Sequence, residues 1–368
     1  MKKALIWLLL CPVLLGGCGL AARSKAVEQL RPVETMGYDF DGTAVTVSAA
    51  SGAGKPMAVA ARGGSIPQAM ENLRGWSDAQ ELFFAHVRYV LAGEAGARLG
   101  LDELMDYFSR STQTTLEIPL LVVRGGEARE LVTAPAGQER EITALLASMQ
   151  RDAEQTGTAR CFTLREIIRR LRRSGAALCC AVERRQPGEN APDAEDAPSV
   201  LCAGYAVLKN AALAAFLDTE AALGADLILD LAGQANYVLP CAEGSVTVSL
   251  LKSETELIPL RDSRGALTVL VSTRLRAGVL SDRGADIADP EVRRALENAL
   301  ARAAAAQEAA ALTACRELDA DFLELRRAVG GRAPEAAAPD FLRTLRWQVR
   351  VEALLERSYD LDGGGAYG

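Results

Sequence analysis

One segment near the middle of the chain limits how the whole sequence can fold. Residues 186–199, QPGENAPDAEDAPS, contain three prolines, five acidic or asparagine residues and no large apolar side chain. Such a segment cannot bury enough apolar surface to offset the entropy lost on ordering. The sequence therefore predicts a linker at 186–199 between an N-terminal α/β region, residues 31–185, and a C-terminal domain, residues 200–362.

The remaining sequence has the composition of folded domains. Of 368 residues, 49% are apolar and 24% are charged, and 48 acidic side chains outnumber 41 basic ones. The acidic balance, with no basic block after residue 3, argues against nucleic acid as a partner. One histidine, His86, cannot supply a His-rich metal site or a Ser/His/Asp triad, and phosphate-binding, dinucleotide-binding and hydrolase motifs are absent from the sequence. We therefore expect no catalytic residues and no metal site.

The amino-terminal sequence is typical of an export signal. Two lysines precede an apolar run over residues 4–15, and LGGC follows at 15–18. A helix formed by this run would rise about 18 Å, too little for the ~30 Å hydrocarbon core of a bilayer. We therefore predict that residues 1–17 are a signal peptide that is removed.

The LGGC sequence resembles the lipobox of bacterial lipoproteins, whose cysteine receives a diacylglyceryl group before cleavage. The resemblance implies that Cys18 becomes the first mature residue and carries a covalent diacylglycerol and an N-acyl lipid. Two or three acyl chains suffice for stable membrane anchoring, so residues 18–30 would be a lipid-anchored tether. An ordinary secretory signal with an unmodified cysteine is the alternative.

Helix and strand signals alternate through the N-terminal region. Apolar runs and period-two patterns predict strands at 44–49, 82–91 and 118–123. Ser65 as N-cap predicts a helix at 65–73, and the spacing of apolar residues predicts helices at 102–109 and 163–173. His86 falls inside the predicted buried strand, where we interpret it as a packing residue. The pattern indicates mixed α/β structure, in one or two subdomains.

The C-terminal domain is dominated by one predicted helix. Asp289 is a suitable N-cap, and apolar residues recur every three or four positions as far as Gly330, a span of about 60 Å. Gln307 lies on this stripe and would need a hydrogen-bond partner. We expect strands at 201–207, 246–251, 256–260, 267–273 and 349–355, a short helix at 341–347, and a disordered tail at 363–368. The predicted fold is multi-domain α+β, with mixed sheets, packed helices and one long helix in the C-terminal domain.

Six cysteines follow Cys18 along the chain. Their even number permits disulfides, but their spacing matches no disulfide framework, and domains of this size do not need such cross-links. We interpret them as buried apolar thiols and leave their pairing open. They are Cys161, Cys179, Cys180, Cys202, Cys241 and Cys315.

Short motifs along nearly the whole chain resemble one family. The N-terminal motifs are EQL at 28–30, MGYD at 36–39, ELFFAHVR at 81–88, GE at 93–94, an Arg at 110 and GEA at 126–128. The C-terminal motifs are GYAVLK at 204–209, LD at 217–218, RELDAD at 316–321 and a Trp at 347. With the lipobox, their order resembles the Ger(x)C lipoproteins, the C subunits of spore germinant receptors. The family's usual residues after the lipid cysteine are replaced by GLAA at 19–22, which indicates a divergent branch.

The resemblance implies a subunit without catalytic activity that is needed for assembly or signal coupling in nutrient-triggered germination. It would lie on the outer face of the spore inner membrane, anchored in the membrane lipids through Cys18, beside the integral membrane A and B subunits of the receptor. The family-motif positions, interpreted as structural, are Gly37, Asp39, His86, Arg110, Gly204, Asp321 and Trp347. The alternative is a lipoprotein that captures a small-molecule germinant between its two units; a cell-wall enzyme would need paired carboxylates in a cleft.

Overall fold

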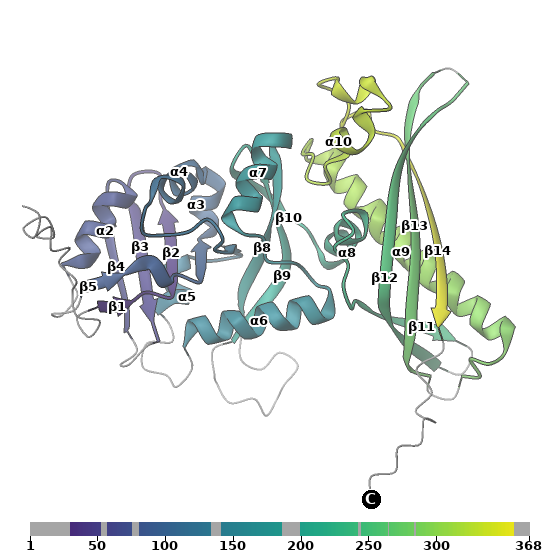
Figure 1. Ribbon diagram of the computed structural model, residues 1–368, viewed down its shortest axis with the longest axis horizontal. Helices are drawn as coiled ribbons and strands as arrows, with labels where there is room; N and C mark the ends of the chain where they lie inside the picture. The colour runs from purple at the N-terminus through teal and green to yellow at the C-terminus, as the bar shows by residue number, and fades with distance from the viewer. Residues whose placement is uncertain are drawn as a thin grey trace, which may run out of the picture.

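The computed structural model describes residues 30–52, 57–75, 81–133, 141–185, 199–241, 244–263, 265–282 and 285–356. Figure 1 shows an eight-stranded sheet in the N-terminal part and a four-stranded sheet of longer strands in the C-terminal part, both packed with helices. This architecture confirms the predicted mixed α+β fold. The predicted signal peptide, Cys18, most of the linker at 186–199 and the tail at 363–368 lie outside the described residues.

The eight-stranded sheet has the order β10-β9-β8-β7-β6-β2-β3-β4. The central strands β2, β6, β7 and β8 are parallel, and the flanking strands are antiparallel. The central strand β7 reads as a continuous apolar run because it is buried on both faces. The strands are β2 (Thr35–Phe40), β3 (Val45–Ser51), β4 (Met57–Gly63), β6 (Tyr89–Ala92), β7 (Leu120–Val123), β8 (Ala176–Arg185), β9 (Ser199–Lys209) and β10 (Ala212–Phe216).

Helices connect these strands, and the first begins at the predicted cap, Ser65. Ser65 accepts a hydrogen bond from the Gln68 amide, and Thr163 forms a capping box with Glu166. The helices predicted at 65–73, 102–109 and 163–173 are therefore confirmed. The helices are α2 (Ile66–Arg74), α3 (Glu94–Leu99), α4 (Asp102–Arg110), α5 (Ala128–Thr133), α6 (Ile142–Thr156) and α7 (Leu164–Ser174).

The strand predicted at 82–91 is wrong as a single element. It divides into β5 (Glu81–Phe83), the 3₁₀ turn η3 (Phe84–His86) and β6. β5 pairs with β1 (Leu30–Pro32) in a separate two-stranded sheet. The apolar run therefore contributes one strand to each of two sheets. His86 lies in the turn between these strands and is exposed to solvent.

The eight-stranded sheet takes strands from both sides of the predicted linker. β8 and β9, which flank residues 186–198, pair antiparallel, so β9 and β10 belong to the N-terminal sheet. One hydrophobic core also continues from this sheet to residues beyond 310, including Leu312, Phe322 and Leu342. The composition of residues 186–199 indicates few side chains suited to burial. It gives no sign that the strands on either side, β8 and β9, pair with each other.

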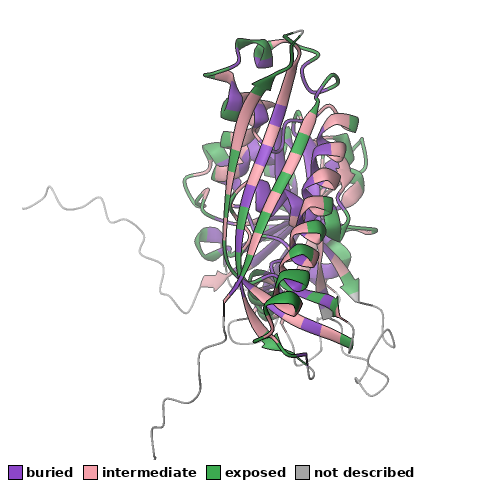
Figure 2. Cartoon of the chain, turned by 90° about the vertical axis from the view of Figure 1, so that its right-hand side faces the viewer, coloured by how far each residue is buried: buried purple, intermediate pink, exposed green. Residues whose placement is uncertain are grey.

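The four-stranded sheet has the order β11-β12-β13-β14. Its strands are β11 (Asn236–Cys241), β12 (Gly244–Arg261), β13 (Leu267–Ser281) and β14 (Trp347–Glu356). The strands predicted at 246–251 and 256–260 are one strand, because a register shift between Leu250 and Lys252 interrupts the alternation without ending the pairing. Buried and less buried residues alternate along these strands (Figure 2).

The long helix predicted from Asp289 to Gly330 is shorter than expected. Asp289 does cap it, but α9 (Pro290–Glu317) ends before a turn in which Asp319 and Glu324 have positive φ angles of 47° and 53°, and α10 (Leu325–Gly330) follows. α8 (Thr219–Ile228) packs against α9. The helix predicted at 341–347 is wrong, because residues 341–344 form turns after η4 (Pro334–Ala337) and Trp347 already begins β14.

The buried face of α9 is shifted by one residue near its middle. Ala304 and Glu308 are fully buried, whereas Gln307 is only partly buried and accepts a 2.7 Å hydrogen bond from the Tyr237 hydroxyl. The prediction that Gln307 needs a partner is confirmed. Within the described ranges, no helix is long and apolar enough to cross a membrane.

Candidate functional site

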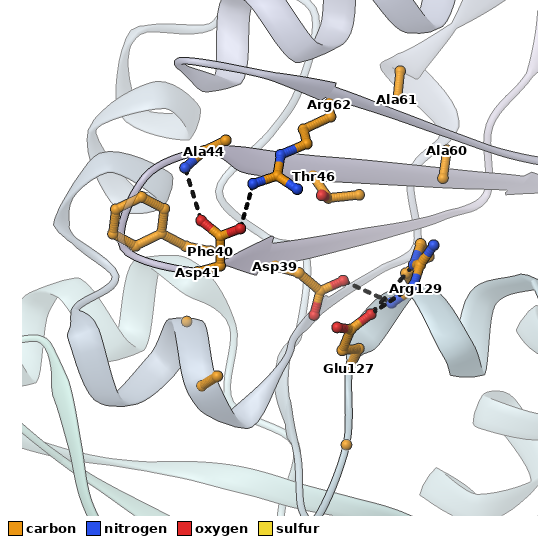
Figure 3. A pocket seen from close by; sticks show the side chains of 13 residues that line it. Asp39, Phe40, Asp41, Ala44, Thr46, Ala60, Ala61, Arg62, Glu127 and Arg129 are labelled. Carbon is orange, nitrogen blue, oxygen red and sulfur yellow. Dashed lines mark hydrogen bonds and ion pairs between the residues drawn. The ribbon is translucent and has the colours of Figure 1, made fainter.

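Three of the sequence motifs meet at one edge of the eight-stranded sheet. Asp39 lies near the end of β2, Gly93 follows β6, and Gly126 follows β7. Because β2, β6 and β7 are parallel, their carboxyl ends lie at the same edge, where open α/β sheets place binding sites. Figure 3 shows the resulting pocket with its charged side chains.

Asp39 joins two of these motifs. Its Oδ1 accepts a 2.7 Å hydrogen bond from the Ala128 amide, and its Oδ2 accepts one of 2.8 Å from the Arg129 amide. Burial raises the pKa of Asp39, while the same two hydrogen bonds act in the opposite direction. The carboxylate therefore caps the first turn of α5 from a distant strand, which supports the structural role expected for Asp39.

Two glycines allow this close approach. A Cβ atom on Gly93 would lie 2.0 Å from Asp39 Oδ1 and 3.1 Å from the Ala128 nitrogen. A Cβ atom on Gly37 would lie 2.2 Å from the Ser48 Oγ. A side chain at either position would displace the Asp39 carboxylate or the Ser48 hydroxyl, so glycine at these motif positions preserves the packing of β2, β6 and α5.

The pocket beside Asp39 has a volume of about 300 Å³ and carries charges of both signs. Arg62 forms an ion pair with Asp41, and Arg129 forms one with Glu127 at 3.0 Å. Backbone and hydroxyl hydrogen bonds, chiefly from the Ala44 amide, lower the pKa of Asp41. The pocket can therefore offer both guanidinium groups and carboxylates to a small polar molecule. Among its described lining residues there is no histidine, cysteine or serine.

A second group of motif residues lies where the eight-stranded sheet meets the C-terminal part. Lys209, at the end of β9, donates a 3.0 Å hydrogen bond to the Leu318 carbonyl and lies 3.6 Å from an Asp319 carboxylate oxygen. Gly204, on the same strand, has a φ angle of +80°, and a Cβ there would lie 3.2 Å from the Leu217 carbonyl oxygen. The structure thus joins the GYAVLK and RELDAD motifs.

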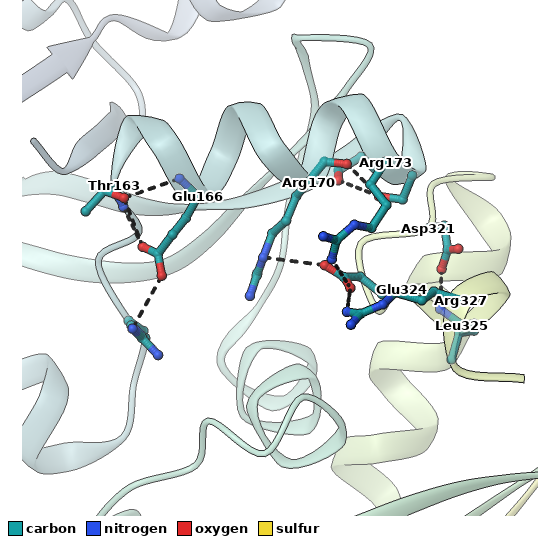
Figure 4. A network of polar contacts seen from close by, with 11 residues as sticks. Thr163, Glu166, Arg170, Arg173, Asp321, Glu324, Leu325 and Arg327 are labelled. Atoms are coloured by element: carbon teal, nitrogen blue, oxygen red, sulfur yellow. Dashed lines mark hydrogen bonds and ion pairs between the residues drawn. The ribbon is translucent and has the colours of Figure 1, made fainter. Parts of the chain in front are cut away.

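Arginines of α7 extend this junction (Figure 4). Glu324 lies 3.8 Å from Arg170 and 3.5 Å from Arg173, and it also pairs with Arg327 at 2.8 Å. The Arg170 guanidinium lies 4.1 Å from the centre of the Phe162 ring. Burial lowers the pKa of Arg170, and the nearby Glu324 carboxylate opposes that effect. The Arg170 and Glu324 side chains are 12% and 14% exposed, so their ion pair is well protected from solvent, whereas Arg173 and Arg327 are exposed.

Asp321 and Trp347 occupy structural positions at the same junction. Asp321 is 2% exposed and accepts hydrogen bonds from the Leu325 and Arg326 amides at 2.7 and 3.1 Å, which caps α10. Burial raises the pKa of Asp321. Trp347 begins β14, with the Arg316 guanidinium 4.5 Å above its ring.

Two buried carboxyl groups were not predicted from the sequence. Asp226 accepts a 2.7 Å hydrogen bond from the Tyr205 hydroxyl, and burial raises its pKa to about 7. Glu308 accepts a 2.5 Å hydrogen bond from the Thr273 hydroxyl, its second oxygen has no hydrogen-bond partner, and burial raises its pKa to about 7. Apolar periodicity gives no signal for such residues, because each is a carboxyl side chain among the buried apolar residues of its helix.

Other predicted positions are not part of either site. His86 lies at the opposite end of the sheet from Asp39, with its ring 5.4 Å from that of Phe83. Arg110 ends α4 and forms an exposed ion pair with Asp106 at 2.8 Å. Its hydrogen bond with Asp106 raises the pKa of Arg110. In the part of the chain that is described, no group of three His, Cys, Asp or Glu side chains is placed to hold a metal ion.

Comparisons with known proteins agree with this arrangement. Residues 23–183 match the family model of the spore germination protein N-terminal domain, and residues 203–358 match the model described as spore germination B3/GerAC like, C-terminal. The crystal structure of the GerBC protein is similar in fold, with a TM-score of 0.53 and 13% sequence identity; the match covers 87% of this chain and 96% of that one. No curated protein matches the chain.

Proposed function

We propose that this chain, which belongs to the GerAC-like family of spore germination proteins, acts in spore germination as the lipid-anchored C subunit of a germinant receptor, with a coupling role. The observation that carries the proposal is the match to both family domains, in order, over residues 23–183 and 203–358. In this proposal the protein lies on the outer face of the spore inner membrane, attached through acyl groups on Cys18, and contacts the integral membrane A and B subunits.

The junction between the two parts of the structure supports a coupling role. One core continues from the eight-stranded sheet to the turn after α9, and Lys209, Arg170 and Glu324 add polar contacts across the same boundary. A partner bound to either part would therefore act on a continuous body. The anchor would confine encounters with the membrane subunits to two dimensions, which raises their effective concentration.

The anchor is tested by one substitution with a matched control. Cys18→Ala removes the proposed lipid attachment site, whereas Cys11→Ala changes a cysteine inside the apolar run of the signal. We expect the Cys18→Ala protein to leave the spore membrane fraction and nutrient germination to fail, and the Cys11→Ala protein to behave as wild type. A Cys18→Ala protein that stays in the membrane fraction and supports germination would contradict the proposal.

Capture of a small polar solute is a second candidate function, which the pocket at the carboxyl ends of β2, β6 and β7 favours. Calorimetry of the full-length protein with amino acids, sugars and nucleosides tests it. We expect micromolar binding of one class, lost in Arg62→Gln and Arg129→Gln and retained in Arg165→Gln, whose side chain pairs with Glu117 on the surface. Absence of heat with every class would exclude this function.

A further inference from the structure

Two cysteine thiols lie in contact across neighbouring strands. The Sγ atoms of Cys180 on β8 and Cys202 on β9 are 3.8 Å apart. Cys180 is opposite Tyr205 and Val182 is opposite Cys202, with a register shift between these two pairs. The register shift brings the side chains of Cys180 and Cys202 into contact. In a regular antiparallel pair of strands, diagonal neighbours of this kind lie farther apart.

The two thiols have different surroundings. Cys180 is fully buried, and its pKa is raised, first by a hydrogen bond with Cys161 and next by one with Cys202. Cys202 is partly exposed, and a hydrogen bond from the Cys180 thiol lowers its pKa. Cys202 is therefore the less buried residue of the pair and the one that ionises more readily, which is the property of an attacking thiol.

We propose that Cys180 and Cys202 form a cross-strand disulfide when the protein meets a small-molecule disulfide. The Cys202 thiolate attacks one sulfur of the oxidant, forms a mixed disulfide and releases one equivalent of small thiolate. The Cys180 thiol then attacks the Cys202 sulfur, and its proton leaves with the second equivalent of thiol. Two protein thiols are oxidised and one external disulfide is reduced to two thiols.

Three of the other cysteines lie away from this pair, which leaves Cys161 as the competing partner of Cys180. Cys179 points to the other face of β8, where its thiol donates to the Leu120 carbonyl at 2.9 Å, and the Cys315 thiol donates to the Ala320 carbonyl at 3.0 Å. Cys241 is partly exposed on β11, which belongs to the four-stranded sheet, and provides a matched control.

The position of the bond gives it a structural consequence. Cys180 lies within the residues matched by the N-terminal family model, and Cys202 lies immediately before those matched by the C-terminal model. A disulfide would link β8 to β9 covalently at the boundary between the residues matched by the N-terminal and C-terminal family models. It would also close a loop through residues 186–198, and such a cross-link stabilises the folded state chiefly by restricting the unfolded chain.

Peptide mapping of the full-length protein tests the proposal. The protein is treated with glutathione disulfide, alkylated under denaturing conditions and digested without reduction. We expect one cross-linked species that joins the peptides of Cys180 and Cys202, a mass lower by about 2 Da and reversal by dithiothreitol. Cys241→Ser should form the same species, and Cys202→Ser should form none. Oxidation should also raise the thermal midpoint by a few degrees.

Two results would overturn the proposal. Alkylation of both Cys180 and Cys202 in full after prolonged treatment with excess oxidant would show that the pair does not bond in the folded protein. Recovery of Cys180 joined to Cys161 instead of Cys202 would assign the reaction to a different pair. Because the peptides are identified directly, neither result depends on whether a variant folds.

Discussion

The Nζ atom of Lys209 at the end of β9 lies 3.0 Å from the carbonyl oxygen of Leu318, the C-cap residue of α9. This hydrogen bond joins residues 109 positions apart in the sequence. It also satisfies a carbonyl at a helix end, where no intrahelical partner exists. The Lys209 side chain from the eight-stranded sheet and the Leu318 carbonyl from the C-terminal part are thus hydrogen-bonded across the boundary between the two parts.

Lys209→Met tests this contact while keeping the apolar stem of the side chain. We expect the free energy of unfolding to fall by about 1 kcal/mol, since a charge-assisted hydrogen bond is lost at a partly exposed site. Urea denaturation measures the change. Lys252→Met, which removes only a surface pair with Glu254, is the control and should change the free energy by less than about 0.5 kcal/mol. Equal effects of the two substitutions would argue against a role for Lys209 at the junction.

The sequence predicted local elements well where one capping signal and one periodic face coincide. The caps at Ser65, Thr163 and Asp289 are observed, because each depends on residues within one helical turn. The end of α9 was missed because two residues other than glycine, Asp319 and Glu324, adopt left-handed backbone conformations that are held by contacts with distant residues.

The candidate site was predictable only as separate motifs. The sequence contains the Gly-x-Asp, Gly-Glu and Gly-x-Ala elements, but nothing local shows that Asp39 caps the helix that begins at Ala128, 89 residues later. Similarly, His86 was placed in a strand because its neighbours are apolar, whereas the chain changes from one sheet to another at that point. The cap formed by Asp39 and the position of His86 both depend on pairing between residues far apart in the sequence, which apolar periodicity does not reveal.

Gly93→Ala tests the packing at the pocket. The added methyl group would meet Asp39 Oδ1 and the Ala128 amide, so Asp39 would have to release its cap on α5. We expect a loss of about 1–3 kcal/mol in the free energy of unfolding, measured by urea denaturation. Gly126→Ala, in the same pocket, has its nearest atoms at 3.4 Å or more and should be nearly neutral. A neutral Gly93→Ala would contradict the tight packing described here.

Glu308→Gln tests the buried carboxyl on α9. Its pKa is about 7 in the folded protein against an ordinary value of 4.5, so the folded state binds more protons between these values and the free energy of unfolding falls as pH rises through them. The loss amounts to about 3 kcal/mol above pH 7, at about 1.4 kcal/mol per pKa unit. We expect Glu308→Gln to be more stable than wild type at pH 8 and similar at pH 4.

Urea denaturation at the two pH values measures this difference. Asp226 should retain its own dependence in the variant, because its pKa is raised independently by burial beside Tyr205. Glu317→Gln, at an exposed position of the same helix, should follow the wild-type pH profile. A Glu308→Gln variant whose profile also follows the wild type would show that Glu308 does not titrate in this range.

Asp321→Ala tests the cap of α10. The substitution would leave the amides of Leu325 and Arg326 without their acceptor in a buried place, so we expect a loss of about 2 kcal/mol in the free energy of unfolding. Denaturation in urea is the measurement, with the exposed Asp340→Ala as control. Asp321→Asn retains one acceptor oxygen, so its loss in free energy of unfolding should lie between those of Asp321→Ala and Asp340→Ala. An unchanged stability in Asp321→Ala would contradict the capping role.

The central claim, that this germination protein works from a lipid anchor, is tested most directly at its mature amino terminus. Mass spectrometry of the protein extracted from spore inner membranes should show a chain that begins at Cys18 and carries a diacylglyceryl group and an N-acyl chain. A chain recovered from the soluble fraction with an unmodified amino terminus would contradict the account.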